Sequence, residues 1–221
     1  MQILFVGAHS DDIEIGCWSL VRKCVLSDYD VRFLILSDED SMAHFTRRRS
    51  EARRSVRRFG MPDDSVEFLG MADGFINCDR TSVSACRSRC ANMSPDVVVV
   101  HSNRDGHQDH RAANAIVRST FRKRVILSYS VFCSGESLFQ PSILNYLTKI
   151  DEIEKKAHLC TFESQLFRLN LEDLESWEMK VGEGAGRRAE GFEVMLQAGS
   201  SVNTLERFIA DLDLVYRRQR I

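Results

Sequence analysis

Short runs of apolar, β-branched residues alternate with longer segments of helical periodicity along the first part of the chain. The runs predict five strands, at residues 2–8, 31–37, 66–70, 96–101 and 125–131. The fourth run contains four consecutive valines, which suits a strand that is buried on both faces. Alternation of strands and helical segments is typical of βαβ units, which build a mostly parallel sheet. We therefore expect an α/β fold, arranged as a Rossmann-like three-layer sandwich.

Four helical segments are predicted among these strands, because their apolar residues recur at intervals of three and four positions. They are a segment from Cys17 to Val25, residues 46–59, residues 83–92, and a segment that begins near His110. The second of them is expected to end at Gly60, since glycine commonly follows the last helical turn and Pro62 cannot continue the helix.

The pattern weakens after the fifth strand. Residues 145–170 and 202–218 are predicted to be helical or mixed, and no repeat or low-complexity linker separates them from the first part. We therefore treat the chain as one domain, with an α/β core at residues 1–131 and a C-terminal elaboration at residues 132–221. Ligands of open α/β sheets bind at the carboxyl ends of the strands, so we expect this elaboration to wall the site.

Composition narrows the classes of partner and compartment. The 221 residues are 43% hydrophobic, which is enough to bury one sizeable core. The 30 basic and 32 acidic side chains nearly cancel, so no overall field favours nucleic acid or a membrane surface, and no apolar run is long enough to span a membrane. The seven cysteines are odd in number and form no CxxC pair, which argues against a disulfide framework and predicts a cytoplasmic protein.

A first cluster of metal-binding residue types follows the first strand. His9, Asp11 and Asp12 stand between that strand and the first helix. Capping is the ordinary explanation for an aspartate at a helix start, because its carboxylate accepts free backbone N–H groups. Capping would account for Asp11 or Asp12 considered alone.

A second cluster of the same kind follows the fourth strand, which capping does not explain. Residues 101–110 contain His107, Asp109 and His110 just before the fourth helix. Because the carboxyl ends of parallel strands meet at one edge of a sheet, we expect the two clusters to face each other.

Zinc accepts histidine nitrogens and carboxylate oxygens, and a catalytic zinc site has three protein ligands and a position for water. His9, Asp12 and His110 supply such a set, for zinc or for another divalent metal. Zinc lowers the pKa of a bound water to about 7 and so produces a nucleophile at neutral pH.

Three further residues are candidates for acid–base chemistry. Asp11 is adjacent to a predicted ligand but itself free, so we expect it to be the general base. His107 is a candidate for stabilising the oxyanion and protonating the leaving amine. Asp109 is expected to hold the tautomer of that imidazole, as the carboxylate does in a Ser-His-Asp arrangement.

The same residues carry a resemblance to a known family. Residues 8–16 read AHSDDIEIG, which resembles the AHPDDxExG signature of the PIG-L/LmbE-like deacetylases, and residues 105–110 read DGHQDH, which resembles their second signature, DxHPDH. Three shorter segments also resemble the family: the helix from Arg48 to Gly60, LGMADG at residues 69–74, and RAEGF at residues 188–192.

The resemblance implies zinc-dependent removal of an N-acyl group, generally acetyl. The residue roles that it implies are zinc ligation by His9, Asp12 and His110, general-base catalysis by Asp11, a role for His107 supported by Asp109, and substrate contacts by Arg48 and Asp73. The division of roles between Asp11 and Asp12 rests mainly on this resemblance. Three positions depart from the family pattern: Ser10 and Gln108 replace prolines, and Phe162 stands where histidine is common.

We therefore predict hydrolysis of the N-acetyl amide of an amino sugar or glycoside. The alternative is an amidase that acts on an acylated natural-product intermediate. A non-catalytic sugar-binding homologue is disfavoured because the three expected metal ligands are present together with the expected catalytic residues Asp11 and His107. A nucleotide-binding protein is disfavoured because the loop after the first strand lacks the glycines that admit a pyrophosphate.

The second helix leaves the nature of the substrate open. Residues 47–58 contain seven arginines in twelve positions, spread over more than one face. A solvated helix is one interpretation. A basic flank that attracts an anionic substrate is the other, since guanidinium groups bind phosphate through two hydrogen bonds. The expected partner is thus a small N-acylated amino sugar or a related compound, with a homo-oligomer left open and neither nucleic acid nor membrane expected.

Overall fold

The computed structural model describes residues 1–37, 42–131, 139–182, 185–196 and 201–216. Its helices and strands are β1 (Gln2–Gly7), α1 (Asp12–Leu26), β2 (Asp30–Ser37), α2 (Met42–Arg58), the 3-10 helix η1 (Asp63–Ser65), β3 (Val66–Met71), α3 (Arg80–Arg89), β4 (Val97–His101), α4 (Gln108–Thr120), β5 (Val125–Tyr129), β6 (Ile143–Tyr146), α5 (Lys149–Leu159), α6 (Leu171–Val181), β7 (Ala189–Leu196), α7 (Val202–Asp211) and β8 (Val215–Tyr216). Cys133 and the end of the last predicted helical segment, residues 217–218, lie outside the described residues.

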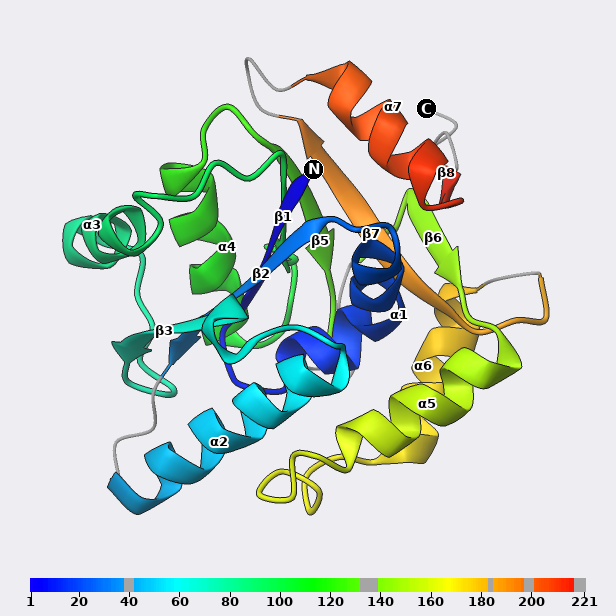
Figure 1. The fold of residues 1–221 in the computed structure, drawn as a ribbon, viewed down its shortest axis with the longest axis horizontal. Coiled ribbons are helices and arrows are strands. Elements are labelled where there is room, and N and C mark those ends of the chain that lie inside the picture. Colours follow the sequence, from blue (N-terminus) through cyan, green and yellow to red (C-terminus); the bar gives the residue numbers. More distant parts are fainter. Residues whose placement is uncertain (38–41, 132–138, 183–184, 197–200, 217–221) are drawn as a thin grey trace.

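One eight-stranded sheet runs through the molecule, in the order β3-β2-β1-β4-β5-β7-β6-β8 (Figure 1). The first five of these strands are parallel to one another, which confirms the predicted α/β fold with its mostly parallel sheet. The chain runs outward from β1 to β3 and then returns to place β4 on the other side of β1. The order therefore reverses between β1 and β4, and a crevice forms at the carboxyl ends of two such strands.

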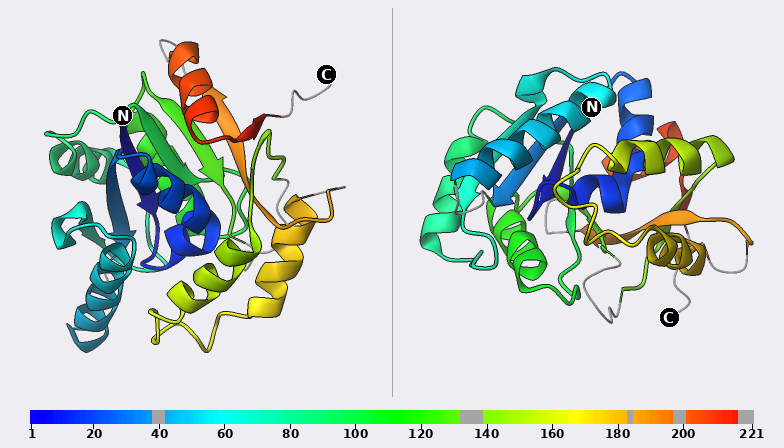
Figure 2. Two further views of the ribbon diagram at one scale, coloured as in Figure 1. Left: turned by 45° about the vertical axis from the view of Figure 1, so that its right-hand side comes forward. Right: turned by 90° about the horizontal axis from the view of Figure 1, so that it is seen from below.

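Helices cover both faces of the sheet (Figure 2). Alternate residues of each strand point to opposite faces, so Phe5 and Val99 pack with α1, α2 and α7, whereas Val6 and Val98 pack with α3 and α4. All four valines of β4 are fully buried, as expected for a strand covered on both faces. No helix within the described ranges is both long enough and apolar enough to cross a membrane.

Helix boundaries follow local capping signals. Helix α2 ends just before Gly60, which has a φ of 84°, as predicted. Helix α3 begins three residues earlier than predicted, at Arg80, because Asp79 and Ser82 form a capping box in which each side chain accepts the backbone N–H of the other.

The C-terminal part confirms helix in the two segments predicted to be helical or mixed, since α5 lies in residues 145–170 and α7 in residues 202–218, but it also contains strands that were not predicted. Three strands there, β6, β7 and β8, extend the sheet through antiparallel pairs, with β7 joined to β5 on one side and to β6 on the other. Helices α5 and α6 lie between β6 and β7 in the chain, and α5 packs against α1. Hence the two parts of the chain share one sheet.

A buried carboxylate from β7 connects this extension to α1. Glu190 accepts the backbone N–H groups of Ser19 and Leu20 at 2.9 and 3.0 Å, and Lys155 of α5 lies 2.9 Å from the same carboxylate. A side chain that accepts N–H groups in the middle of a helix interrupts its hydrogen-bond ladder and bends it. Helix α1 changes direction along its length (Figure 1). Glu190 thereby sets the course of the helix whose first turn carries Asp12.

Gly16 allows α1 to approach β5 closely. A Cβ atom at this position would collide with the ring of Tyr129, which is itself fully buried. The Tyr129 hydroxyl donates to the carbonyl oxygen of Val6 at 3.0 Å and so cannot easily move aside.

We expect Gly16→Ala to lower the free energy of unfolding by about 1–3 kcal/mol, the usual cost of overpacking a core. Helix propensity alone predicts the opposite sign, a gain of about 1 kcal/mol. Urea denaturation of the two proteins decides between them. A more stable Gly16→Ala variant would show that α1 does not need the close approach.

Candidate active site

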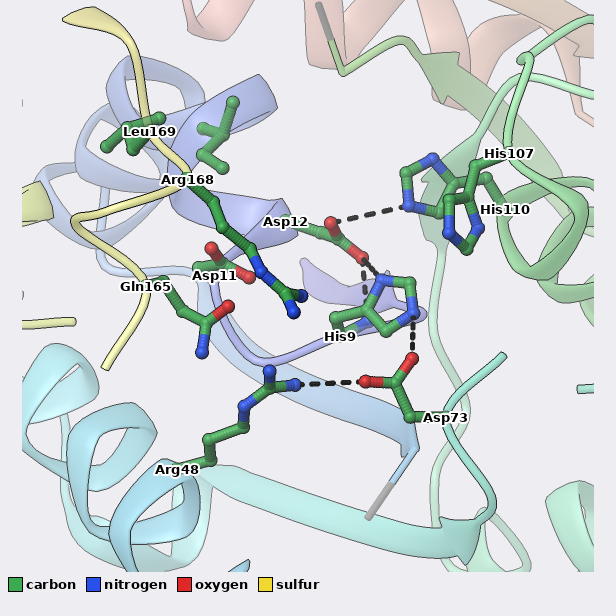
Figure 3. A pocket seen from close by; sticks show the side chains of 11 residues that line it. His9, Asp11, Asp12, Arg48, Asp73, His107, His110, Gln165, Arg168 and Leu169 are labelled. Carbon is green, nitrogen blue, oxygen red and sulfur yellow. Dashed lines mark hydrogen bonds and ion pairs between the residues drawn. The ribbon is translucent and has the colours of Figure 1, made fainter. Parts of the chain in front are cut away.

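The candidate site lies where β1 and β4 end. The loop after β1 carries His9, Asp11 and Asp12, and His107 and His110 stand at the start of α4. A cavity of about 160 Å³ opens there (Figure 3). It is lined by His9, Asp11, Asp12, Ile15, Arg48, Asp73, His107, His110, Gln165, Arg168 and Leu169. Seven of the eight residues selected from the sequence therefore meet at one cavity, and Asp109 is the exception.

Three of these side chains converge in a way that suits a metal ion. The Asp12 carboxylate lies 3.3 Å from Nδ1 of His9 through one oxygen and 3.5 Å from Nε2 of His110 through the other. One ligand atom from each of the three residues lies within 4.8 Å of the others. Two imidazoles and a carboxylate are a donor set that zinc prefers.

Two further groups overlap this set, His9 with His107 and Asp109, and His101 with Asp105 and His110. Neither is as well placed for chemistry on a substrate. Asp109, His101 and Asp105 are buried and do not line the cavity.

In the absence of a cation, protons on the histidine rings balance the negative charge of the Asp12 carboxylate. Burial disfavours the ionised carboxylate, but His110, His101 and His9 outweigh it and hold the pKa of Asp12 well below its usual range. Burial also disfavours the protonated form of His110, yet Asp12 and Asp105 raise its pKa to about 9. A bound divalent cation takes the place of such protons.

Asp11 lines the cavity but does not use its carboxylate for capping. It occupies the N-cap of α1, where its side chain forms no capping hydrogen bond. Burial, reinforced by the charge of Asp12, raises the pKa of Asp11 to about 6. The capping explanation for Asp11 therefore does not hold, and its carboxylate is available to a ligand.

His107 presents a neutral imidazole to the same cavity. Burial, followed by the charges of His110 and His9, lowers its pKa. Its Nδ1 accepts the backbone N–H of Asp109 at 3.2 Å. The proton of the neutral ring therefore lies on Nε2, which makes that atom a hydrogen-bond donor.

Asp109 is fully buried behind the cavity. Its carboxylate accepts the backbone N–H groups of Gly74 and Ile76 at 2.7 and 3.2 Å, and lies 3.3 Å from Nε2 of His9. The hydrogen bond that joins Asp109 to His107 comes from the backbone, so support of His107 by the carboxylate stays a prediction. What the carboxylate does hold is the Gly74 loop and the His9 ring.

Arg48 and Asp73 form the side of the cavity opposite α4. A nitrogen of Arg48 lies 3.2 Å from Asp73, whose other oxygen lies 3.1 Å from Nε2 of His9. The hydrogen bond with His9, together with the charges of His9 and Arg48, lowers the pKa of Asp73 to about 2. Asp73 is thus ionised and connects the predicted substrate side to a predicted metal ligand (Figure 3).

His101 supports the site from behind. It is fully buried, its ring stacks on that of His110 with centroids 3.8 Å apart, and its Nε2 lies 3.0 Å from Asp12. Asp105 lies 3.1 Å from Nδ1 of His110. Such neighbours orient the rings of metal-binding histidines.

Sequence reasoning missed the residues that the C-terminal part contributes. Gln165, Arg168 and Leu169 line the cavity from the segment between α5 and α6. Phe162, which stands where the family commonly has histidine, is buried and does not line the cavity. Gln165 ends the segment in which Phe162 replaces the family's common histidine, whereas no motif in the sequence marks Arg168 or Leu169.

The arginine-rich helix α2 combines the two interpretations of its sequence. Arg48 lines the cavity. Arg47 instead lies 3.3 Å from Glu163, and Arg57 lies 2.8 Å from Asp63, both in exposed ion pairs. Of these three arginines, Arg48 is the one that lines the cavity.

The family model for PIG-L, described as GlcNAc-PI de-N-acetylase, matches residues 4–121. That range is more than half of the 221 residues. The chain belongs to the PIG-L family. The match covers both histidine-aspartate clusters and ends just after α4, so Gln165 and Arg168 lie outside it.

Solved structures with the same fold have different activities. The N,N'-diacetylchitobiose deacetylase from Pyrococcus horikoshii is 19% identical, with a TM-score of 0.74 over 91% of this chain and 86% of that one. A deacetylase of teicoplanin biosynthesis is 12% identical, with a TM-score of 0.73 over 91% and 100%. The 4-carboxy-2-hydroxymuconate hydratase GalB from Pseudomonas putida is 16% identical, with a TM-score of 0.72 over 88% and 96%. At these identities the likeness concerns the fold, and the reaction must be argued from the side chains.

The position of Asp109 leads to a prediction about stability. We expect Asp109→Ala to lower the free energy of unfolding by about 1–3 kcal/mol, because it leaves the buried N–H of Ile76 and the half-buried N–H of Gly74 without an acceptor. Asp64→Ala, which removes an exposed carboxylate from η1, is the matched control and should change stability by less than about 0.5 kcal/mol. Equal effects in urea denaturation would mean that Asp109 does not hold the Gly74 loop.

Proposed function

We propose that this PIG-L family member hydrolyses the N-acetyl amide of an amino sugar with the help of a divalent metal ion, which we assign as zinc. The observation that carries the proposal is the meeting of three metal-binding side chains with Asp11, a carboxylate free of capping bonds, at one cavity. Membership of a family described by its de-N-acetylase activity supports the same reaction.

The donor set fits the metal. Two imidazole nitrogens and a carboxylate oxygen face one point. Without a cation, protons on the histidine rings balance the charge of the carboxylate, and a bound cation would replace these protons. We assign His9, Asp12 and His110 as the ligands. Zinc bound there would polarise the amide carbonyl and lower the pKa of the attacking water.

Asp11 is the general base in this proposal. A carboxyl with a pKa raised to about 6 is ionised at neutral pH and is a stronger base than an ordinary aspartate. It accepts the proton of the water that attacks the carbonyl carbon. Asp11 then gives this proton to the nitrogen of the leaving amine, and the bond between that nitrogen and the carbonyl carbon breaks.

His107 stabilises the oxygen of the tetrahedral intermediate. Its lowered pKa keeps the ring neutral, and its Nε2–H donates a hydrogen bond to the negative charge as it develops. Arg48 and Asp73 are proposed to bind hydroxyl groups of the sugar, since a guanidinium and an ionised carboxylate at the cavity wall offer a donor and an acceptor. An acylated natural-product intermediate is the second substrate class, because a deacetylase of teicoplanin biosynthesis shares the fold.

The metal assignment is tested by elemental analysis of purified protein. We expect about one divalent ion per chain, and a marked loss of metal in Asp12→Ala, which removes one of three protein ligands. Circular dichroism of the same samples controls for folding. A folded wild-type protein that neither contains nor takes up zinc would contradict the assignment.

The catalytic assignment is tested by acetate release from N-acetylated amino sugars, with and without added zinc. We expect Asp11→Asn to keep its metal and to lower kcat by a factor of about 10² to 10⁴, the range for loss of a positioned general base. His107→Ala should also keep metal, with a fall in kcat of about 10² or more. Loss of metal in Asp11→Asn and its retention in Asp12→Ala would exchange the two roles; full activity in both variants would exclude the proposed hydrolase mechanism.

A further inference from the structure

The cavity contains a cation that the proposed mechanism does not use. Arg168, from the segment between α5 and α6, lines it beside Gln165, and its guanidinium points toward the interior between Asp11 and Arg48 (Figure 3). Within the described ranges of the chain, its side chain forms no ion pair. The side chain is exposed, and its guanidinium carbon lies 5.2 Å from the centre of the Phe167 ring, which is 78% exposed.

The other charges of the cavity already have partners. Arg48 lies 3.2 Å from Asp73, and Asp12 lies among the histidines that we assign to the metal. Asp11 is the base, and no ion pair joins it to Arg168. Among the residues that the structure describes, no carboxylate therefore forms an ion pair with Arg168 at the cavity.

The segment that carries Arg168 is fastened to α2 beside Arg48. Glu51 is fully buried and accepts both the backbone N–H and the hydroxyl of Ser164, at 3.0 and 2.5 Å. Gln165 donates from its amide to the same hydroxyl at 3.0 Å. Arg54 of α2 donates to the carbonyl oxygen of Thr161 at 3.2 Å. Because the backbone is held in this way, placing Arg168 on a ligand costs less conformational entropy than in an unattached loop.

We propose that Arg168 binds an anionic group of the substrate, a phosphate or a carboxylate, and thereby selects acidic N-acetyl amino sugars over neutral ones. The proposal rests on the proposed deacetylase function for its reaction, but not for the binding event. A guanidinium pairs with either group through two parallel hydrogen bonds, which gives both affinity and orientation. The residue lies outside residues 4–121, so it is not in the part matched by the family model.

The test compares acetate release from neutral N-acetylglucosamine with release from its 1-phosphate, from its 6-phosphate and from N-acetylmuramic acid, which carries a carboxylate. The two phosphates and the carboxylate separate the chemical sources of the charge. We expect the wild type to favour at least one acidic substrate. Arg168→Gln should lower kcat/KM for that substrate by about 10- to 100-fold, mainly through KM, since a charged hydrogen bond is lost. Its activity on the neutral sugar should change by less than about twofold.

Arg53→Gln is the matched control, because Arg53 is an exposed arginine of α2 that does not line the cavity. It removes the same charge and should leave the preference unchanged. Equal losses on neutral and acidic sugars in Arg168→Gln, or a wild type without preference for any acidic sugar, would overturn the proposal.

A binding measurement distinguishes failure of the proposed reaction from failure of the proposed anion site at Arg168. If the wild type releases acetate from none of the substrates, the proposed function fails for this class. Calorimetry with glucosamine, glucosamine 1-phosphate and glucosamine 6-phosphate then judges Arg168 separately. Tighter binding of a phosphate by the wild type, lost in Arg168→Gln and kept in Arg53→Gln, supports the anion site; equal binding of all three amines by the wild type overturns it.

Discussion

The parallel pairing of β1 with β4 is the constraint on which the site depends. Phe5 of β1 stands opposite Val99 of β4, so the loops that follow the two strands leave the sheet at the same edge. Their histidines and carboxylates then meet although they lie about a hundred residues apart in the chain. The pairing itself is held by the apolar side chains that each strand buries on both faces of the sheet.

Polar groups buried away from the cavity keep this arrangement in place. Glu190 of β7 bends α1 and connects it to Lys155, Asp109 holds the Gly74 loop, and Glu51 holds the segment that carries Arg168. Each is a carboxylate with several donors around it. A buried carboxylate is costly unless its hydrogen bonds are satisfied, so each of these contacts restricts the backbone strongly.

The fold and the chemistry give separate information about function. A hydratase shares this fold with deacetylases, so the sheet and its helices alone do not specify the reaction. The family match covers the two clusters that we assign to the metal and to acid–base catalysis. The wall that contains Gln165 and Arg168 lies outside the residues matched by the family model.

The sequence by itself determined the parallel core and the placement of the two clusters, because strand-forming runs, helix periodicity and residues at strand ends are local signals. The same signals located helix α2 and its end at Gly60. Strand β7 could not be found in this way: its sequence AEGFEVML contains two glutamates and a glycine, and the partners of Glu190 lie in distant elements, α1, α5 and β6. The place of Arg168 at the cavity was likewise decided by tertiary structure alone, since it follows from hydrogen bonds to Glu51, more than a hundred residues earlier in the chain.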